Sequence, residues 1–378
     1  MRVFVVNSGS SSIKYQLVDV ESGEVVLSGL LERLGERLGE HGAAVADHDS
    51  GMRVVLDRLG SEAASIAAVG HRVVHGGSAF TAPTLIDDEV EAAIAGMSAL
   101  APLHNPANLA GISAARLALP DVPHVAVFDT AFHQSMPAEA YTYAIDREVA
   151  EQHGVRKYGF HGTSHEFVAG RAAELLGRPL DELKLIVLHL GNGASVTAID
   201  GGRSIDTSMG LTPLQGLVMG TRSGDLDPAV LVHLHRVAGL SIDDLDTLLN
   251  TRSGLLGLTG RRDMRDVTAA AAAGDALAEA GLAVWTHRIR HYIGAFFAQL
   301  GGLDAVVFTA GVGENSPALR ARVIERLGHL GLHIDRFLNE RAARGPRIIS
   351  PAGDGPTVLV VPTNEELAIA RAAAAYVG

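Results

Sequence analysis

The sequence predicts an α/β protein built from two related halves, and three observations lead to this fold class. An apolar run, a polar turn, an alternating run and a closing aspartate follow one another in residues 3–19 and again in residues 185–200. Each copy is followed by a Gly turn and a further short run, at residues 23–27 and 201–205. The chain has 378 residues, enough for two domains with sizeable cores. We therefore expect an internal duplication with a β-hairpin at the start of each half.

The turn of each predicted hairpin has a composition that suits phosphate oxygens. Residues 7–12 are one asparagine, one glycine and four serines, which leave backbone N–H groups accessible to a ligand. Lys14 follows this turn and can add charge-assisted hydrogen bonds. The second copy has Gly191, Asn192 and Gly193 at the same place. One such turn alone favours an ordinary hairpin with a polar turn, and its repetition shifts the interpretation to phosphate binding.

Composition excludes several classes of protein. A net charge of −12 argues against a nucleic-acid partner or an anionic membrane. The absence of cysteine excludes disulfides, Cys-ligated zinc and thiol catalysis. No apolar run approaches the roughly 20 residues of a membrane span, and the N-terminal run is too short for a signal peptide. We therefore expect a cytoplasmic protein.

The first half contains two charged candidates for a site. Residues 66–74 predict a buried strand with Arg72 near its Gly-rich end, where it can bind an anion or simply lie on the surface. Helices are expected over residues 87–101 and 103–119, before a strand over 123–128. Asp129 follows that strand, at the end where ligands usually bind in α/β sheets, although it could instead cap the core.

The second half contains a candidate histidine and a candidate arginine. His161 is expected in a Gly-spaced loop before a helix that ends at Leu176. Arg222 lies in a long Gly-, Pro- and Asp-rich loop before a helix at Val230, and long loops in compact domains tend to be functional. We also predict one long helix over residues 267–300 and strands over 305–309 and 358–361. Residues 310–316 lack the third glycine of the dinucleotide fingerprint.

The last helix is expected to run to Tyr376. Thr363 is predicted to cap its N-terminus, with Glu366 three residues later completing a capping box. That arrangement leaves Glu365 free for another role.

Nine motifs in this order resemble those of the acetate kinase (acetokinase) family, and jointly they are highly specific. They are residues 7–14, 70–77, 103–106, 128–133, 158–165, 189–195, 220–228, 309–316 and 363–367. Two differences from the family pattern are visible. The region 34–53 is shorter than is usual, and Arg261 and Arg262 stand where smaller residues are common.

The resemblance implies a duplicated RNase H-like (actin-like ATPase) fold of two domains with a central cleft, as in the acetate and sugar kinase, Hsc70 and actin superfamily. The N-terminal domain would comprise residues 1–131 and 365–378, and the C-terminal domain residues 132–364, with the nucleotide site and a homodimer interface. The cleft would hold the active site and close on the nucleotide.

The resemblance also implies the reaction ATP + acetate ⇌ ADP + acetyl phosphate, with Mg²⁺ or Mn²⁺. Arg72 and Arg222 would hold the carboxylate and the moving phosphoryl group, and His161 would donate to an equatorial oxygen. Asp129 would orient the site through metal-bound water or a neighbouring arginine. Acetate is already ionised at neutral pH, so no general base is required.

Further residues are assigned to ligands by the same resemblance. Asn7 and Glu365 would hold the metal, mostly through water. Phosphate contacts would come from Lys14, His189, Leu190, Gly191, Asn192 and Gly193. Adenosine contacts would come from Asp263, Met264, Arg265, Gly311, Val312, Gly313, Glu314 and Asn315. The methyl group of acetate would enter a pocket of Val74, Leu103, Phe160 and Pro213.

Two other functions are compatible with this pattern in part. A propionate or butyrate kinase of the same family would need a longer acyl pocket. We expect Val74, two residues after Arg72 on a strand, to face the same side and shorten that pocket. A non-enzymatic ATP-binding module of the Hsc70 type has no use for two arginines and a histidine at a carboxylate-sized site. It also needs a peptide-binding domain, for which no residues remain.

Overall fold

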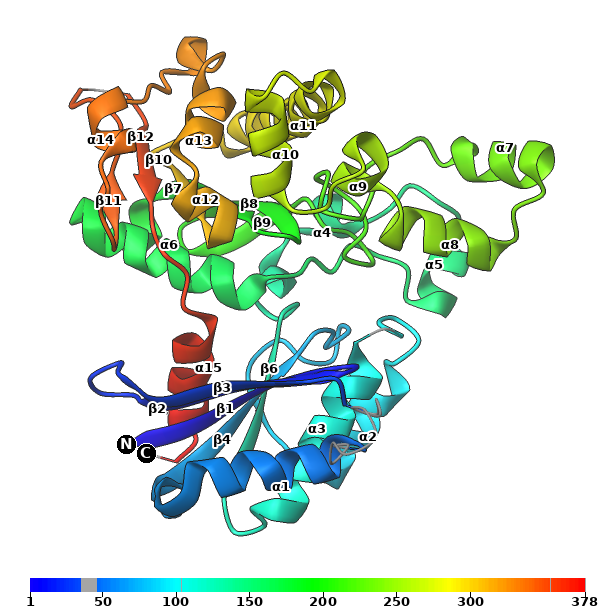
Figure 1. The fold of residues 1–378 in the computed structure, drawn as a ribbon, viewed down its shortest axis with the longest axis vertical. Helices are drawn as coiled ribbons and strands as arrows, with labels where there is room; N and C mark the ends of the chain where they lie inside the picture. The colour runs from blue at the N-terminus through cyan, green and yellow to red at the C-terminus, as the bar shows by residue number, and fades with distance from the viewer. Residues whose placement is uncertain (35–45, 103, 354, 378) are drawn as a thin grey trace. The chain divides into compact units, whose positions relative to one another are not determined.

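The computed structural model describes residues 1–34, 46–102, 104–353 and 355–377 (Figure 1). The chain forms two compact units. The first comprises Met1–Gln134, Gly162–Ser164 and Asn364–Gly378, and the second comprises Ser135–His161 and His165–Thr363. Two expectations fall outside the described residues. One is the place of Leu103 in the acetate pocket, and the other concerns most of the region 34–53, which is shorter than is usual in the family.

The first unit is built on a six-stranded sheet with the order β3-β2-β1-β4-β6-β5. Its strands are β1 (Arg2–Gly9), β2 (Ser12–Asp19), β3 (Val25–Glu32), β4 (Ile66–Val73), β5 (Thr84–Leu85) and β6 (His124–Phe128). Its helices are α1 (His48–Leu59), η1 (Gly60–Ser65), α2 (Asp88–Gly96), α3 (Asn105–Ala118) and α15 (Glu365–Ala374). The predicted hairpin is confirmed, since β1 and β2 are antiparallel with Asn7 opposite Lys14.

Helices cover both faces of this sheet. Gly70 on β4 leaves room for α15, because a Cβ at that position would come within 2.6 Å of Ile369. Val69, whose side chain points to the other face, packs in a core with Ala114 and Ala115 of α3. Figure 1 shows α15, the red helix from the end of the chain, beside strands from its beginning.

The second unit repeats the topology of the first. Its sheet has the order β11-β12-β10-β7-β8-β9, so β7, β8, β9, β10, β12 and β11 take the places of β1, β2, β3, β4, β6 and β5. The strands are β7 (Lys184–Leu190), β8 (Ala194–Asp200), β9 (Arg203–Thr207), β10 (Ala305–Thr309), β11 (Arg347–Ile348) and β12 (Thr357–Val360). Strand directions agree as well, with β7 antiparallel to β8 and parallel to β10. The predicted duplication is therefore confirmed.

Most helices of the second unit come between β9 and β12 in the sequence. The segment η2 (Phe132–Ser135) leads from the first unit into the second. The helical segments that follow it are, in chain order, α4 (Ala138–Tyr141), α5 (Arg147–His153), α6 (Gly162–Leu176), η3 (Leu180–Glu182), α7 (Ala229–Ala238), α8 (Ile242–Thr251), α9 (Gly254–Thr259), α10 (Met264–Ala272), α11 (Ala276–Leu300), α12 (Ala310–Asn315), α13 (Pro317–Ile324), η4 (Gly328–Leu330) and α14 (Arg336–Glu340). Within the described ranges, no helix combines the length and the apolar character that crossing a membrane would require.

Three helix predictions are wrong in detail. The expected helix over residues 267–300 is two helices, because Gly274 has φ +92° and Asp275 caps α11 by accepting from the N–H groups of Leu277 and Ala278. The helix expected over 87–101 ends at Gly96. The residue that caps α15 is Asn364, whose side chain accepts from the N–H of Leu367 at 3.0 Å, and not Thr363.

Candidate active site

Arg72 and Asp129 form a bidentate ion pair at the ends of two neighbouring strands of the first unit. Arg72 lies near the end of β4, and Asp129 directly follows β6, which runs parallel to β4. The distances are 3.1 Å from Nε to Oδ1 and 2.6 Å from Nη2 to Oδ2. Burial lowers the pKa of Arg72, but the carboxylates of Asp129 and Glu365 outweigh it and raise that pKa overall. The Arg72 guanidinium therefore stays charged, and two of its N–H groups are directed at Asp129.

The carboxylates near Arg72 leave this part of the first unit negatively charged. Burial raises the pKa of Asp129, Arg72 opposes this effect, and the charge of Glu365 adds to it. The charges of Asp129 and Glu365 thus repel each other beside a single guanidinium. A divalent cation would relieve this repulsion.

Asn7 and Glu365 supply the kind of oxygen that magnesium prefers. Asn7 lies near the turn end of β1, and Glu365 is the first residue of α15. Mg²⁺ commonly keeps several waters and takes only one or two carboxylates from the protein. Across residues 1–34, 46–102, 104–353 and 355–377, no group of three or more His, Cys, Asp or Glu side chains could hold a metal. An amide and a carboxylate completed by water fit Mg²⁺.

Two other predicted residues of the first unit are placed differently from expectation. Lys14 forms an ion pair with Glu366 of α15, so the glutamate assigned to a capping box serves this contact instead. Val74 is buried but lies one residue beyond β4, and its N–H donates to Asn108 Oδ1 at 3.0 Å. Strand alternation therefore does not fix the side to which Val74 points, and that argument for a short acyl pocket fails.

His161 occupies a strained position at the start of α6 in the second unit. Its φ of 58° lies in the left-handed region, which is costly for a residue with a Cβ and typical of functional sites. Its ring stacks on His189 with centroids 4.2 Å apart. Its Nδ1 lies 2.9 Å from Ser195 Oγ. As predicted, His161 stands before the helix.

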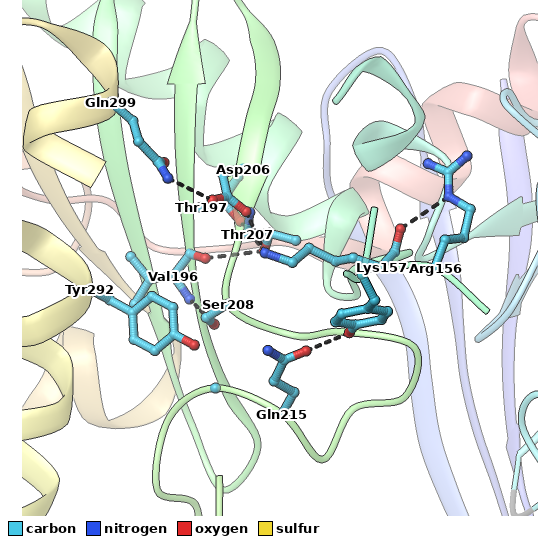
Figure 2. Close-up of polar contacts among 12 residues, drawn as sticks. Arg156, Lys157, Val196, Thr197, Asp206, Thr207, Ser208, Gln215, Tyr292 and Gln299 are labelled. Carbon is cyan, nitrogen blue, oxygen red and sulfur yellow. Dashed lines mark hydrogen bonds and ion pairs between the residues drawn. The ribbon is translucent and has the colours of Figure 1, made fainter. Parts of the chain in front are cut away.

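The segment that leads to His161 is anchored to the sheet of the second unit (Figure 2). Lys157 Nζ pairs with Asp206 Oδ1 on β9 at 2.6 Å, and both side chains are largely buried. Gln299 of α11 donates to the other oxygen of Asp206 at 3.1 Å. Tyr158 and Gly159 both donate their N–H groups to the carbonyl of Gly210. These contacts fix the backbone just before the strained histidine.

Arg222 is a half-buried cation without a carboxylate partner among the described residues. Its Nη1 donates to the carbonyl of Pro213 at 2.7 Å, and burial lowers the pKa of its guanidinium. A Cβ at Gly193 would lie 3.0 Å from Arg222 Nη2 and 3.5 Å from His161 Nε2. Glycine at position 193 thus lets the two nitrogens approach the same stretch of backbone. A guanidinium of this kind favours an anion.

Asp225 connects the loop that carries Arg222 to Gly216 and to helix α11. Gly216 N–H donates to Asp225 Oδ1 at 3.0 Å, and Tyr292 of α11 donates its hydroxyl to Oδ2 at 2.7 Å. Burial and then the Asp225 carboxylate raise the pKa of Tyr292, which keeps its proton available for this bond. The loop is therefore a rigid support for Arg222.

A cavity of about 1140 Å³ lies in the second unit. Eight residues predicted for the nucleotide line it: Gly191, Asn192, Asp263, Met264, Arg265, Gly311, Val312 and Asn315. Asp263 caps α10 and pairs with Arg265, and hydrogen bonds from Arg265 lower the pKa of Asp263 to about 2. The volume suits a nucleoside-sized ligand.

Several other predicted nucleotide residues do not line this cavity. His189 lies against His161, Leu190 is buried at the end of β7, and Gly193 lies beside Arg222. The carbonyls of Gly313 and Glu314 accept from the buried Arg320 at 2.8 and 2.9 Å. Those two residues thus attach α12 to α13.

Sequence reasoning missed ten residues that line the same cavity. They are Met219, Gly220, Thr221, Leu255, Arg262, Thr268, Ala269, Ala272, Trp285 and Ser316. Trp285 is the only tryptophan of the chain, and nothing local in its Ala-rich surroundings indicates a ligand. Gly220 and Thr221, by contrast, belong to the family motif over residues 220–228. Their place beside the cavity could have been inferred from that motif.

Phe160 and Pro213, both predicted for the acetate pocket, belong to the second unit, and Val74 belongs to the first. Phe160 is fully buried and Pro213 is half-buried. The acetate pocket stays a prediction.

A nucleoside-sized cavity bordered by Gly-rich turns, together with a nearby arginine that has no carboxylate partner within the described ranges and a stacked histidine, defines a phosphotransferase on a duplicated α/β fold. The family model of the acetokinase family matches residues 2–371. The chain belongs to the acetokinase family.

Known relatives and solved structures agree with this assignment. An acetate kinase of Clavibacter michiganensis subsp. michiganensis is 60% identical, over 98% of this chain and 97% of the relative. The crystal structure of Porphyromonas gingivalis acetate kinase has a TM-score of 0.95 at 40% identity and covers 100% of both chains. A propionate kinase from Francisella tularensis subsp. tularensis has a TM-score of 0.93 at 40% identity, over 99% of both chains.

Proposed function

We propose that this protein transfers a phosphoryl group reversibly between ATP and acetate, with Mg²⁺, and forms ADP and acetyl phosphate. The observation that carries the proposal is Arg222, a half-buried guanidinium without a carboxylate partner in the described ranges, next to His161 Nε2. The neighbouring Gly220 and Thr221 border the nucleoside-sized cavity. Acetate as the acceptor follows from the relatives named acetate kinase.

The proposed reaction forms one bond and breaks another at the same phosphorus. A carboxylate oxygen of acetate attacks the γ-phosphorus of ATP while the bond to the β-phosphate oxygen breaks, and ADP leaves. Charge then spreads over three equatorial oxygens, which N–H donors can stabilise. Arg222 and His161 would donate to those oxygens. No proton has to be removed, because acetate is ionised at neutral pH.

The first unit would supply the remaining contacts. Arg72, fixed by Asp129, would orient the carboxylate of acetate, since a guanidinium matches a carboxylate in shape and charge. Asn7 and Glu365 would hold Mg²⁺ through water. When bound, that ion would neutralise charge on the phosphate groups. By the family resemblance alone, Val74 would line the pocket for the acyl chain.

We also infer a homodimer formed through the second unit. Helix α7 buries none of its residues in the single chain and exposes Val230, Val232 and Val237, of which Val237 is 72% exposed. Figure 1 shows α7 and α8 at the periphery of that unit. A second copy would cover these side chains. A Val232→Glu/Val237→Glu variant should sediment as a monomer if α7 is in the interface.

Acyl phosphate formation tests the proposed function directly. Purified protein is incubated with ATP, Mg²⁺, hydroxylamine and either acetate, propionate or butyrate, and the hydroxamate product is measured. We expect acetate to give the highest kcat/KM. A higher value for propionate, the acceptor named for the Francisella relative, would reassign the acceptor. Nucleotide binding without any hydroxamate would support an ATP-binding module instead.

A further inference from the structure

Ser195 lies between two histidines in the core of the second unit. Its Oγ is 2.9 Å from His161 Nδ1 and 2.7 Å from His165 Nε2. Ser195 is on β8, two residues beyond Gly193, and His165 is on the first turn of α6. Ser195 and His165 are both fully buried. None of the roles assigned above to the reaction uses Ser195 or His165.

The single proton of Ser195 limits how these bonds can be arranged. A hydroxyl donates one hydrogen bond and accepts up to two. Ser195 can therefore donate to only one of the two ring nitrogens, and the other nitrogen must carry a proton and donate to Oγ. For His161 this leaves two possibilities. Either Ser195 donates to His161 Nδ1 and accepts from His165, or His161 Nδ1 donates to Ser195, whose own proton then goes to His165 or elsewhere.

The two arrangements give His161 opposite chemistry at its other nitrogen. When Ser195 donates to Nδ1, the neutral ring carries its proton on Nε2 and can donate to an oxyanion. When Nδ1 carries the proton, a neutral ring has only a lone pair at Nε2, which would repel that oxyanion. Nε2 is the nitrogen that faces Gly193 near Arg222.

We propose that Ser195 is a positioning residue that fixes His161 in the Nε2–H tautomer, and that His165 orients the Ser195 hydroxyl by donating from its own Nε2–H. The inference rests on the proposed function, because the reaction requires a donor at His161 Nε2. The stacked ring of His189 holds the plane of His161, and Ser195 selects its tautomer. Hydrogen bonds in such a chain polarise one another, which strengthens the final donor.

The tautomer can be observed without any assay of activity. Histidine labelled with ¹⁵N gives distinct ring shifts for the Nε2–H, Nδ1–H and doubly protonated forms, and His161→Ala identifies the signals of His161. Spectra are recorded near pH 8.5, about two units above the ordinary histidine pKa. We expect wild-type His161 in the Nε2–H form and a mixture of forms in Ser195→Ala.

Kinetics then show whether the tautomer matters to the reaction. Ser195→Ala should lower kcat about tenfold to a hundredfold, by analogy with the cost of losing the partner that orients a metal-ligating imidazole. The KM values for ATP and acetate should change less than about threefold, because His161 acts mainly in the transition state. His165→Gln keeps an N–H donor and should retain most activity, whereas His165→Leu should resemble Ser195→Ala.

Thr197→Val is the matched control. Thr197 is also fully buried on β8, and its hydroxyl bonds to Thr207 Oγ1 at 2.9 Å. It should leave kcat and the His161 spectrum unchanged. A wild-type His161 in the Nδ1–H or doubly protonated form would overturn the proposal. So would a Ser195→Ala variant that keeps the pure Nε2–H form. A wild type that never phosphorylates a carboxylate refutes the proposed function instead, and the spectra still decide the tautomer.

Discussion

The two units share one topology, yet their arginines lie in opposite electrostatic environments. Arg72 makes two hydrogen bonds to the buried Asp129, and Glu365 adds a second negative charge nearby. Arg222 donates to the carbonyl of Pro213, and burial lowers its pKa without a compensating carboxylate in the described ranges. The first cation is neutralised inside the protein, and the second is left to be neutralised by a ligand.

This difference indicates how the two halves of a duplicated fold can give equivalent residue types different roles in one reaction. An arginine that is paired before the ligand arrives is fixed in direction and contributes to folding. An unpaired arginine contributes little to folding, but an anion that binds it gains a charge-assisted contact. Removing one or the other should therefore separate stability from activity.

Removal of Arg72 should have the largest combined effect. Arg72→Ala leaves the Asp129 carboxylate buried without its partner, which should cost about 3–5 kcal/mol in the free energy of unfolding. The loss of a contact to the substrate should also lower kcat by orders of magnitude. Urea unfolding and steady-state kinetics measure the two effects. Arg72→Ala/Asp129→Ala should recover most of the stability and none of the activity. A single variant as stable as wild type would contradict the role of this pair.

Removal of Arg222 should affect activity alone. Arg222→Ala should lower kcat at least about a hundredfold, as expected for a donor to transition-state charge. The free energy of unfolding should change by less than about 1 kcal/mol, because no buried charge loses its partner. Arg252→Ala, which changes an exposed arginine of the same unit, is the control and should keep full activity. More than about a tenth of wild-type kcat in Arg222→Ala, a loss under ~1.4 kcal/mol, would remove this arginine from the reaction.

Glu365→Ala should raise the Mg²⁺ concentration required for half-maximal activity about tenfold, in the range found when metal-site contacts are lost. Helix α15 should stay folded because Asn364, not the glutamate, caps it. Magnesium titration of activity and far-UV circular dichroism test the two statements. If the magnesium requirement is unchanged, the metal contact lies elsewhere, and Asp129 is the next candidate.

Val74→Ala should have a smaller effect that is limited to the acceptor. It should lower the KM for propionate and leave acetate turnover largely unchanged, because it shortens the buried side chain proposed to limit the acyl group. Discrimination by one methylene is at most about 10- to 200-fold, so the change should be modest. Kinetics with both acids provide the measurement, and an unchanged preference would exclude Val74 from the pocket.

A pair of buried histidines in the first unit predicts a small effect of pH on the free energy of unfolding. In the first unit, His124 Nε2 donates to the carbonyl of Leu119, so its Nδ1 must accept from His71 Nε2, 3.0 Å away. Burial, and for His71 also the neighbouring His124, lowers the pKa of both rings. Below the ordinary pKa near 6.5, the unfolded chain binds protons that the folded chain does not. Stability should therefore fall as the pH falls through 6.5.

Urea unfolding at about pH 7.5 and about pH 5.5, on either side of the ordinary histidine pKa, measures this effect. His71→Leu removes one of the two buried groups and should show a smaller difference between the two pH values than wild type. An equal difference in both proteins would assign the pH dependence to other groups.

Local patterns predicted the framework of both units. Period-two alternation indicated each hairpin, and its repetition indicated the duplication that the two strand orders confirm. The positions of Arg72 and Asp129 at strand ends followed from the sheet, and their pairing follows from β4 and β6 being neighbours. These features depend on residues close in sequence or on a single parallel strand pair.

Contacts between distant segments could not be predicted in this way. The bond from Lys157 to Asp206, and the approach of Trp285 to the cavity, depend on how helices and loops pack. Ser195 reads as an ordinary strand serine until His161 and His165 are placed beside it. The break at Gly274 was visible in the sequence, but the alanines on both sides favoured an unbroken helix.

Phosphorus NMR of the reaction mixture tests the central claim most directly. Wild type and Arg222→Ala are each incubated with ATP, Mg²⁺ and acetate, and the acetyl phosphate and ADP signals are followed in time. We expect both products to appear in equal amounts with wild type, and neither to appear at a comparable rate with an equally stable Arg222→Ala. A wild type that releases ADP and inorganic phosphate without acetyl phosphate, or an Arg222→Ala variant that makes acetyl phosphate as fast as wild type, would contradict it.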